Sequence, residues 1–308
     1  MFEVNQKTLQ KSVTFEGVGL HSGLSSKVKV LPASENHGII FKRVDLEDKN
    51  IIQASYKNVS SAKLCTTLQN EFGHKISTVE HLLAAFYITG IDNALVEVNN
   101  SEIPIMDGSS KEFVKLINDT GLVTQKEKRK YLKIIKKVEM SENEKTISIE
   151  PNTEGLKVDF KLEYNNPIIG NQRNSVNFIS QDLEEIYNSR TFCLYEDIEK
   201  IKKLGLAKGG SLENAIVVKN EEILNSEGLR NNKEFVNHKI LDLAGDFLLS
   251  GYRMLGTVKC VQGGHSLSNL FLKDIFKDSS NFMVVKFDDR VNAKTIFKTS
   301  VNKLAVNA

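Results

Sequence analysis

The chain has 308 residues, more than one ordinary small domain needs and enough for two. With 40% hydrophobic and 26% charged residues its composition is globular, and 41 Lys and Arg against 39 Asp and Glu leave a net charge of only +2. This balance excludes the broad basic surface of a nucleic-acid-binding protein. The longest apolar stretch, Leu82 to Ile88, is far shorter than the ~20 residues of a membrane-spanning helix.

The first residues of the chain and the spacing of its cysteines predict the cellular compartment of the protein. Residues 1–7 lack the apolar core of a signal peptide. Cys65, Cys193 and Cys260 are widely spaced and form no Cys-x-x-Cys pair, so neither a disulfide framework nor a zinc knuckle is predicted. We therefore expect reduced thiols in a cytoplasmic protein.

Strands dominate the beginning of the chain. Alternating apolar and polar residues predict them at residues 12–15, 26–30 and 38–44. An apolar helix is then predicted from about Thr78 to Ile88, ending before Gly90. The last elements predicted in this half are a strand at 94–98 and a helix at 111–119.

A polar, charged connector at residues 125–130 precedes a second series of strands and is our predicted domain boundary. The elements predicted after it are strands at 132–135, 146–149 and 156–164 and helices at 180–188 and 233–249. Both halves thus place strands before an apolar, His-bearing helix, which indicates a duplicated α+β unit. The small, apolar residues 303–308 are expected to fray.

An inserted segment between Cys193 and Val218 interrupts the second half. Its sequence predicts a short helix, a Gly-rich turn and a strand at 215–218. Because it directly precedes the helix at 233–249, this segment is placed to cover a site.

Three ligand-type side chains recur at i, i+4 and i+8 in the helix predicted over 233–249. His238, Asp242 and Asp246 would therefore line a single helix face. The solvated face of an amphipathic helix explains the same spacing, because apolar residues occupy the opposite arc. This face lacks the Glu and Lys that usually fill exposed helix positions, and both interpretations stay open here.

A second ligand-type pair, Glu80 and His81, opens the helix predicted near Thr78. Two His and one Asp suit a Zn²⁺ that keeps its fourth position free for water, and a Glu beside a ligand His suits the base for that water. Ser77-x-x-Glu80 equally fits a capping box, in which Glu bonds back to the helix start. A His on an apolar helix is also often a satisfied core residue.

Two further histidines lie in Gly-rich segments. Gly263 and Gly264 permit unusual backbone angles, so their loop is able to present His265 into a cleft, with a flexible surface turn as the alternative. His21, between Gly19 and Gly23, allows the same two interpretations.

The combination of these clusters resembles the UDP-3-O-acyl-N-acetylglucosamine deacetylases, the zinc amidases of lipid A biosynthesis, over nearly the whole chain. The motifs that carry the resemblance, in chain order, are GVGLHSG (17–23), STVEHLLAA (77–85), IPIMDGSS (103–110), SRTF (189–192), GGS (209–211), HKILD (238–242) and GH (264–265).

For the fold, the resemblance implies α+β architecture with two domains of similar topology. Each domain is a β-sheet layer with a small insertion, and helices pack between the two sheets. We expect an N-terminal domain over 1–127, which contributes Glu80 and His81, and a C-terminal domain over 128–308. Its insertion at about 193–218 would form the passage for the acyl chain.

For the chemistry, the resemblance implies one catalytic Zn²⁺ with the ligands His81, His238 and Asp242. Glu80 would be the general base that activates the attacking water. His265, kept cationic by Asp246, would protonate the leaving amine, because a carboxylate partner raises the pKa of a histidine. The Thr191 hydroxyl would help to stabilise the oxyanion of the tetrahedral intermediate.

The resemblance also implies substrate contacts. Lys239 would bind a phosphate, Phe192 would pack near the sugar, and Tyr164 would stack on uracil. The insertion residues expected to line the acyl passage are Ile198, Leu206, Ala207, Gly210, Ser211, Leu212 and Val217. One departure is Gln262-Gly263-Gly264-His265, where the family often has Lys-Ser-Gly-His and therefore one more phosphate contact.

The predicted function is zinc-dependent hydrolysis of the acetamide of UDP-3-O-acyl-N-acetylglucosamine, which releases acetate and UDP-3-O-acyl-glucosamine. The expected partners are this small-molecule substrate, no nucleic acid and at most a transient contact with the inner-membrane surface, and the protein is expected to be a monomer. The alternatives are a zinc amidase for another acylated sugar and a non-catalytic lipid- or nucleotide-binding module with a structural metal.

Overall fold

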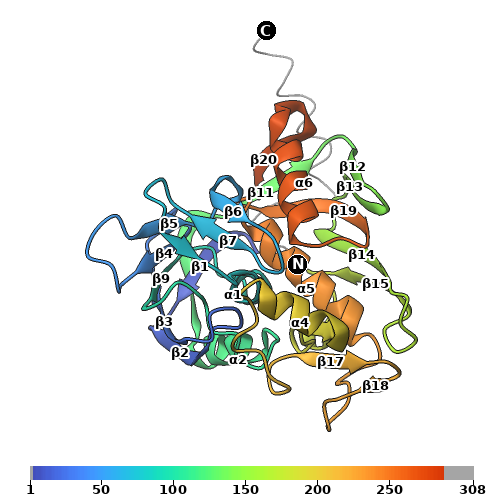
Figure 1. Cartoon of the computed structure of the whole chain (residues 1–308). Helices are drawn as coiled ribbons and strands as arrows, with labels where there is room; N and C mark the ends of the chain where they lie inside the picture. Colours follow the sequence, from blue (N-terminus) through green and yellow to red (C-terminus); the bar gives the residue numbers. More distant parts are fainter. Residues whose placement is uncertain (1–2, 288–308) are drawn as a thin grey trace.

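The computed structural model describes residues 3–287 (Figure 1). Residues 288–308 of the predicted C-terminal domain, and with them the expectation that residues 303–308 fray, lie outside the described residues. Among the described residues, no helix is both long and apolar enough to cross a membrane.

A mixed sheet is built entirely from the first half of the chain. Its five strands, in spatial order, are β2 (Val13–Val18), β3 (Ser25–Pro32), β9 (Ala94–Val98), β4 (Ile39–Arg43) and β5 (Ile51–Gln53). Only the β9–β4 pair is parallel. In β3, Val28 and Val30 are buried while Lys27 and Lys29 are exposed, the period-2 alternation of a half-buried strand.

The second half builds a larger sheet. Five of its strands follow the order β12 (Val138–Glu142), β13 (Lys145–Pro151), β19 (Arg253–Val261), β11 (Lys130–Ile134) and β20 (Phe282–Lys286). Two more strands extend it from β19, namely β14 (Leu156–Glu163) and β15 (Asn171–Asn177).

The two sheets share one topology. The order β2-β3-β9-β4-β5 corresponds to β12-β13-β19-β14-β15, and in both series only the link between the third and fourth strands is parallel. In each half one helix precedes the central strand and another follows it. These helices are α1 (Glu80–Thr89) and α2 (Lys111–Thr120) in the first half, and α5 (Glu234–Leu248) and α6 (His265–Lys277) in the second. The prediction of two α+β units of similar topology is confirmed.

Each half also carries a small insertion before its first long helix. In the first half it is a sheet of β6 (Val59–Ser61), β7 (Thr67–Gln69) and β8 (Lys75–Ile76), preceded by the 3₁₀ helix η1 (Tyr56–Asn58). In the second half it comprises β16 (Phe192–Leu194), α4 (Tyr195–Lys203), β17 (Ile216–Lys219) and β18 (Glu222–Ile223). The short helices α3 (Glu184–Tyr187) and η2 (Ser279–Asn281) complete the fold.

Helices α1 and α5 pack on each other between the two main sheets, at the centre of Figure 1. Eight residues of α1 and fourteen of α5 are buried, as expected for helices that are covered on all sides. A single hydrophobic cluster runs through both halves, from Leu9 to Ile275. The halves therefore share their core, and the helices at its centre are the ones that carry the ligand-type side chains.

Three local predictions were wrong or incomplete. The connector at 125–130 is not a loop, because β10 (Leu122–Lys128) pairs with β1 (Asn5–Leu9) and β11 begins at Lys130. The paired residues are 113 to 123 positions apart along the chain, and local sequence does not indicate such a distant pairing. The helix predicted over 180–188 shortens to α3, and the Gly-rich loop before His265 ends at that residue, where α6 begins. The boundary at 127/128 stays a prediction.

The capping-box interpretation is also wrong. Thr78 has a φ of 58°, outside the helical region, so α1 begins only at Glu80. The Ser77 hydroxyl accepts a hydrogen bond from Thr67 rather than from a helix amide, at 3.0 Å. The Glu80 carboxylate is therefore available for another role.

Candidate metal centre and active site

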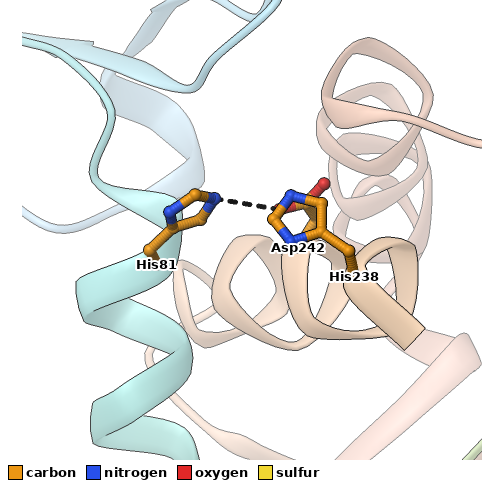
Figure 2. A group of neighbouring side chains, drawn as sticks. All are labelled: His81, His238 and Asp242. Carbon is orange, nitrogen blue, oxygen red and sulfur yellow. Dashed lines mark ion pairs between the residues drawn. The ribbon is translucent and has the colours of Figure 1, made fainter. Parts of the chain in front are cut away.

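Three side chains from α1 and α5 meet where the two helices pack together (Figure 2). His81 Nε2 lies 3.5 Å and His238 Nε2 lies 3.3 Å from the same atom, Asp242 Oδ1. The ligand-type atoms of the three residues all lie within 4.8 Å of one another, and they form the one such group of His, Cys, Asp or Glu found in residues 3–287. This trio is the predicted ligand set.

The chemistry of the trio fits a divalent cation. Asp242 Oδ1 and His81 Nδ1 are buried without a hydrogen-bond partner, a cost that a bound cation removes at the carboxylate. His238 Nδ1 lies 3.1 Å from the Ser189 carbonyl, to which it donates when the ring is neutral, so the lone pair of Nε2 faces the group. Burial lowers the pKa of His238 to about 3, which keeps the ring neutral as a metal ligand requires.

The charge on Asp242 is also secured. Burial by itself raises the pKa of this carboxyl, but the cationic Lys239 and His265 hold it well below its usual range. The Lys239 ammonium donates to Asp242 Oδ2 at 2.7 Å, leaving Oδ1 to face the two histidines.

Burial decides between the interpretations that the sequence left open. His238, Asp242 and Asp246 are 1%, 4% and 2% exposed, so they are not the solvated face of an amphipathic helix. His81 is buried too, but its Nδ1 has no partner, so it is not a satisfied core residue. Such side chains are retained in a core when they bind or react.

Glu80 lies beside the trio as a buried carboxylate whose two oxygens have different partners. Its Oε2 accepts a hydrogen bond from the Thr66 backbone N–H at 3.0 Å. Its Oε1 faces His265 Nε2 at 3.7 Å. Burial raises the pKa of Glu80, against the lowering effect of His265 and His81. A carboxylate with a raised pKa is a better proton acceptor than one in water.

His265 is a second cation of the site, beside Lys239. Burial acts to lower its pKa, but Asp246, Glu80 and Asp242 outweigh it and raise the pKa to about 10. Its Nδ1 donates to Asp246 Oδ2 at 2.9 Å, and Asp246 Oδ1 accepts from the Thr66 hydroxyl at 2.6 Å. Thr66 therefore orients both Glu80 and Asp246, a role for which its sequence context carries no signal.

The approach of α1 to α5 depends on Gly245. A Cβ atom at this position would lie 2.1 Å from the Glu80 carbonyl oxygen and 3.1 Å from the Ala84 nitrogen. No side chain fits there. The glycine thus lets the helix bearing His81 approach the helix bearing His238 and Asp242.

Aromatic residues stand next to the cluster. The Phe192 ring packs 6.5 Å from the His238 ring and 5.8 Å from the Tyr164 ring, measured between centroids. Lys239 Nζ lies 5.5 Å from the Phe192 centroid. The predicted substrate residues Lys239, Phe192 and Tyr164 are thus neighbours, while their individual contacts with substrate stay predictions.

An apolar pocket of about 380 Å³ opens beside Phe192. The residues predicted for the acyl passage that line it are Ile198, Ala207, Gly210, Ser211, Leu212 and Val217. Thr191 and Phe192, which were predicted for other roles, line it as well. Leu206, which the prediction also named, is absent from this lining. The pocket adds residues that the prediction did not assign to it, Leu20, His21 and Leu64 from the first half of the chain. One wall is therefore supplied by the motif around His21.

Gln262 has a local role in the fold. Its side chain bonds to the backbone of Glu163 on both sides, accepting from the N–H at 2.9 Å and donating to the carbonyl oxygen. These bonds fix the end of β14, directly before Tyr164.

Comparisons with known proteins agree with this geometry. Residues 6–277 match the family described as UDP-3-O-acyl N-acetylglycosamine deacetylase. The chain is 40% identical over 290 residues to the UDP-3-O-acyl-N-acetylglucosamine deacetylase of Glaesserella parasuis serovar 5 (strain SH0165), which covers 93% of this chain and 95% of the relative. It is 42% identical over 288 residues to the protein of the same name from Colwellia psychrerythraea (strain 34H / ATCC BAA-681), covering 92% and 94%.

Proposed function

This chain belongs to the UDP-3-O-acyl-N-acetylglucosamine deacetylase family, and we propose that a Zn²⁺ ion held by His81, His238 and Asp242 serves its reaction. The protein hydrolyses the acetamide of UDP-3-O-acyl-N-acetylglucosamine in lipid A biosynthesis. The observation that carries the choice of metal is a ligand set of two imidazoles and one carboxylate, which suits zinc with an open position.

Bound Zn²⁺ would lower the pKa of a water molecule to about 7 and polarise the acetamide carbonyl. Glu80 is the base in this proposal. Its Oε2 is held by Thr66, so Oε1 takes the proton of the attacking water as the new C–O bond forms. The raised pKa of Glu80 favours that transfer.

His265 is the acid. Held through Nδ1 by Asp246, it presents its protonated Nε2 on the side of Glu80 and Asp242, at 3.7 Å and 3.9 Å from their carboxylate oxygens. It donates this proton to the sugar nitrogen as the C–N bond breaks, giving acetate and the free amine. Thr191 lines the adjoining pocket, and in this proposal its hydroxyl binds the developing oxyanion.

Substrate recognition divides between the aromatic neighbours and the apolar pocket. Lys239 binds a phosphate, Phe192 packs against the sugar and Tyr164 stacks on uracil in this proposal. The 380 Å³ pocket takes the 3-O-acyl chain, and each methylene buried there contributes about 0.8 kcal/mol. The pocket therefore separates acylated from unacylated sugars.

We also propose a transient membrane contact at the rim of this pocket. Leu64, Tyr195 and Leu212 are 47%, 47% and 45% exposed there, and Lys200 and Lys203 lie in the last turn of α4. Exposed apolar side chains beside lysines suit brief adsorption to an anionic lipid surface. In co-sedimentation with anionic vesicles, Leu212→Asp should reduce the bound fraction. Absence of binding by the unaltered protein would remove this part of the proposal.

We also propose that the protein acts as a cytoplasmic monomer. One chain supplies the whole ligand trio, so the site needs no partner chain. Its three cysteines are free thiols, which suits a reducing compartment. Light scattering on purified protein should give a mass near 34.5 kDa. A mass twice as large would exclude the monomer.

Acetate release from UDP-3-O-acyl-N-acetylglucosamine, measured before and after metal removal, tests the main proposal. Turnover should disappear with the metal and return with added Zn²⁺, and elemental analysis should find one zinc per chain. His238→Ala should lower metal affinity as well as turnover. Recovery with Fe²⁺ but not with Zn²⁺ would reject zinc and keep the ligand trio.

The two alternative functions predict different results. A binding module with a structural metal needs a fourth protein ligand, whereas the group in residues 3–287 has three. An amidase for another acylated sugar would cleave simple N-acetylglucosamine derivatives that lack UDP. Equal rates on substrates with and without UDP would favour that alternative.

A further inference from the structure

Glu102 is a buried carboxylate outside the catalytic cluster. It is 2% exposed and forms no ion pair with a cationic side chain among residues 3–287. Three hydrogen-bond donors hold it instead. Its Oε1 accepts from the His21 backbone N–H and the Thr78 hydroxyl, both at 2.8 Å, and its Oε2 accepts from the Ser22 backbone N–H at 2.7 Å.

The loop from Gly19 to Gly23 wraps around this carboxylate. Consecutive N–H groups of His21 and Ser22 converge on its two oxygens, as backbone amides do around a bound anion. A Cβ atom at Gly19 would lie 2.5 Å from Glu102 Oε2. The Glu102 carboxylate therefore supports the loop conformation, because it is the acceptor for these two N–H groups.

The same loop holds the insertion. The Lys208 N–H donates to the His21 carbonyl at 3.3 Å, and the Gly209 N–H donates to the Leu20 carbonyl at 3.0 Å. The Ala207 N–H donates to His21 Nδ1 at 3.3 Å. Leu20, His21 and Ala207 all line the apolar pocket, so Glu102 supports the wall on which the two halves of the chain meet.

The third hydrogen-bond donor, the Thr78 hydroxyl, connects Glu102 to the catalytic cluster. Thr78 has a φ of 58°, a conformation that costs a β-branched residue energy and needs support from its surroundings. Its hydroxyl bond to Glu102 supplies that support. Thr78 lies two residues before Glu80 and three before His81, so it sets where α1 begins.

We propose that Glu102 is a positioning residue that fixes the wall of the acyl-chain pocket relative to the start of α1. The inference rests on the proposed function, since it assigns the pocket to the acyl chain and Glu80 to the base. One carboxylate holds both segments, so a chain seated in the pocket places the acetamide at a set distance from Glu80. Substrate selection and turnover thereby depend on the same side chain.

Glu102→Gln tests both links of Glu102 at once, the link to the pocket wall and the link to Thr78. Glutamine keeps the shape, but its NH₂ group must face at least one of the three donors. We expect kcat and the preference for long over short acyl chains each to fall about tenfold, while the metal content of the protein stays unchanged. The matched control is Glu16→Gln, an exposed carboxylate of β2, which should behave like the unaltered protein.

Thr78 separates the two links. Thr78→Val keeps the shape and removes the hydroxyl, so kcat should fall severalfold while the metal content and the acyl-chain preference are retained. Thr78→Ser keeps the hydroxyl and should restore kcat to within about twofold of the original. A purely structural role of Thr78 would not produce rescue by serine together with an unchanged chain preference.

Ligand affinity distinguishes this inference from the function on which it rests. The dissociation constant of the acylated product, measured on metal-free protein, should rise about tenfold in Glu102→Gln and stay unchanged in Thr78→Val. Unaltered protein that binds product but releases no acetate would reject the proposed function alone. Equal behaviour of Thr78→Val and Thr78→Ser, or an unchanged product affinity in folded Glu102→Gln, would overturn the role of Glu102. If Glu102→Gln does not fold, the Thr78 pair decides.

Discussion

The proposed catalytic cluster and the proposed acyl-chain pocket are built in opposite ways. Glu80, His81 and Asp242 are almost fully buried on helices at the centre of the protein, and hydrogen bonds or close charges orient them. The pocket is walled largely by the insertion, whose helix α4 has no buried residue. In the proposed function, the chemistry is thus assigned to a buried, hydrogen-bonded cluster, whereas chain recognition is assigned to apolar contacts at the surface.

The difference has a physical reason. Charged groups in a low-dielectric interior interact strongly, so small displacements change their pKa values and their reactivity. Apolar contacts are non-directional and scale with the area removed from water, so a pocket tolerates looser construction. Changes in the cluster should therefore reduce the rate, and changes in the pocket should reduce affinity for the acyl chain.

The largest effect is expected at Glu80. Glu80→Gln removes the proton acceptor and should lower kcat by about 10³-fold while metal binding is retained, because His81, His238 and Asp242 are intact. Steady-state kinetics and elemental analysis of the same preparation measure both quantities. Glu71→Gln, an exposed site, is the control. A normal rate in Glu80→Gln would place the base elsewhere.

A smaller loss is expected from Gly245→Ala. The new Cβ would lie 2.1 Å from the Glu80 carbonyl oxygen, so α1 must move away from α5. We expect a loss of about 1–3 kcal/mol in the free energy of unfolding, measured with urea, and a decrease in kcat. Gly264→Ala is the matched control, since nothing lies within 4 Å of its Cβ. Equal stabilities of the two variants would argue against close helix packing as the frame of the site.

The pocket should respond differently. Ile198→Ala removes three carbons from the lining, and we expect KM for a long-chain substrate to rise about three- to tenfold with little change in kcat. A short-chain substrate should show no such rise. Glu199→Ala, on an exposed position of the same helix, controls for effects on α4 itself. A fall in kcat for both substrates would contradict the separation of the two regions.

The smallest effect concerns the cysteines of the two regions. Burial raises the pKa of Cys65, near Glu80, to about 12 and that of Cys193, in the pocket lining, to about 11. At pH 8 both are thiols, so alkylation by iodoacetamide should be slow. Its rate should rise about tenfold for each unit by which the pH is raised, as long as the pH stays below the pKa. The half-buried Cys193 should react first, and its modification should raise KM. Peptide mass mapping can follow the order in which the two cysteines react. Faster modification of Cys65 would contradict the tight burial of the cluster.

Much of the fold was readable from periodicity. The helix predicted over 233–249 is α5, Glu234–Leu248, and the two series of strands before His-bearing helices are the two similar sheets. The predictions failed where distant pairing decides local structure. Residues 125–130 look like a polar connector, yet most of them belong to β10, which is a strand because β1 lies beside it. Likewise, the strained φ of Thr78 delays α1, and its support comes from Glu102.

The sequence by itself determined the chemistry that is possible. The spacing of His238, Asp242 and Asp246 places them on one helix face whatever surrounds it. Only the tertiary structure decided that this face is buried, that α1 brings His81 to it past Gly245, and that Thr66 and Glu102 hold the neighbouring segments. Thr66 and its partner Asp246 are 180 residues apart, and contacts over such distances arise from the packing of the whole core, not from local preference.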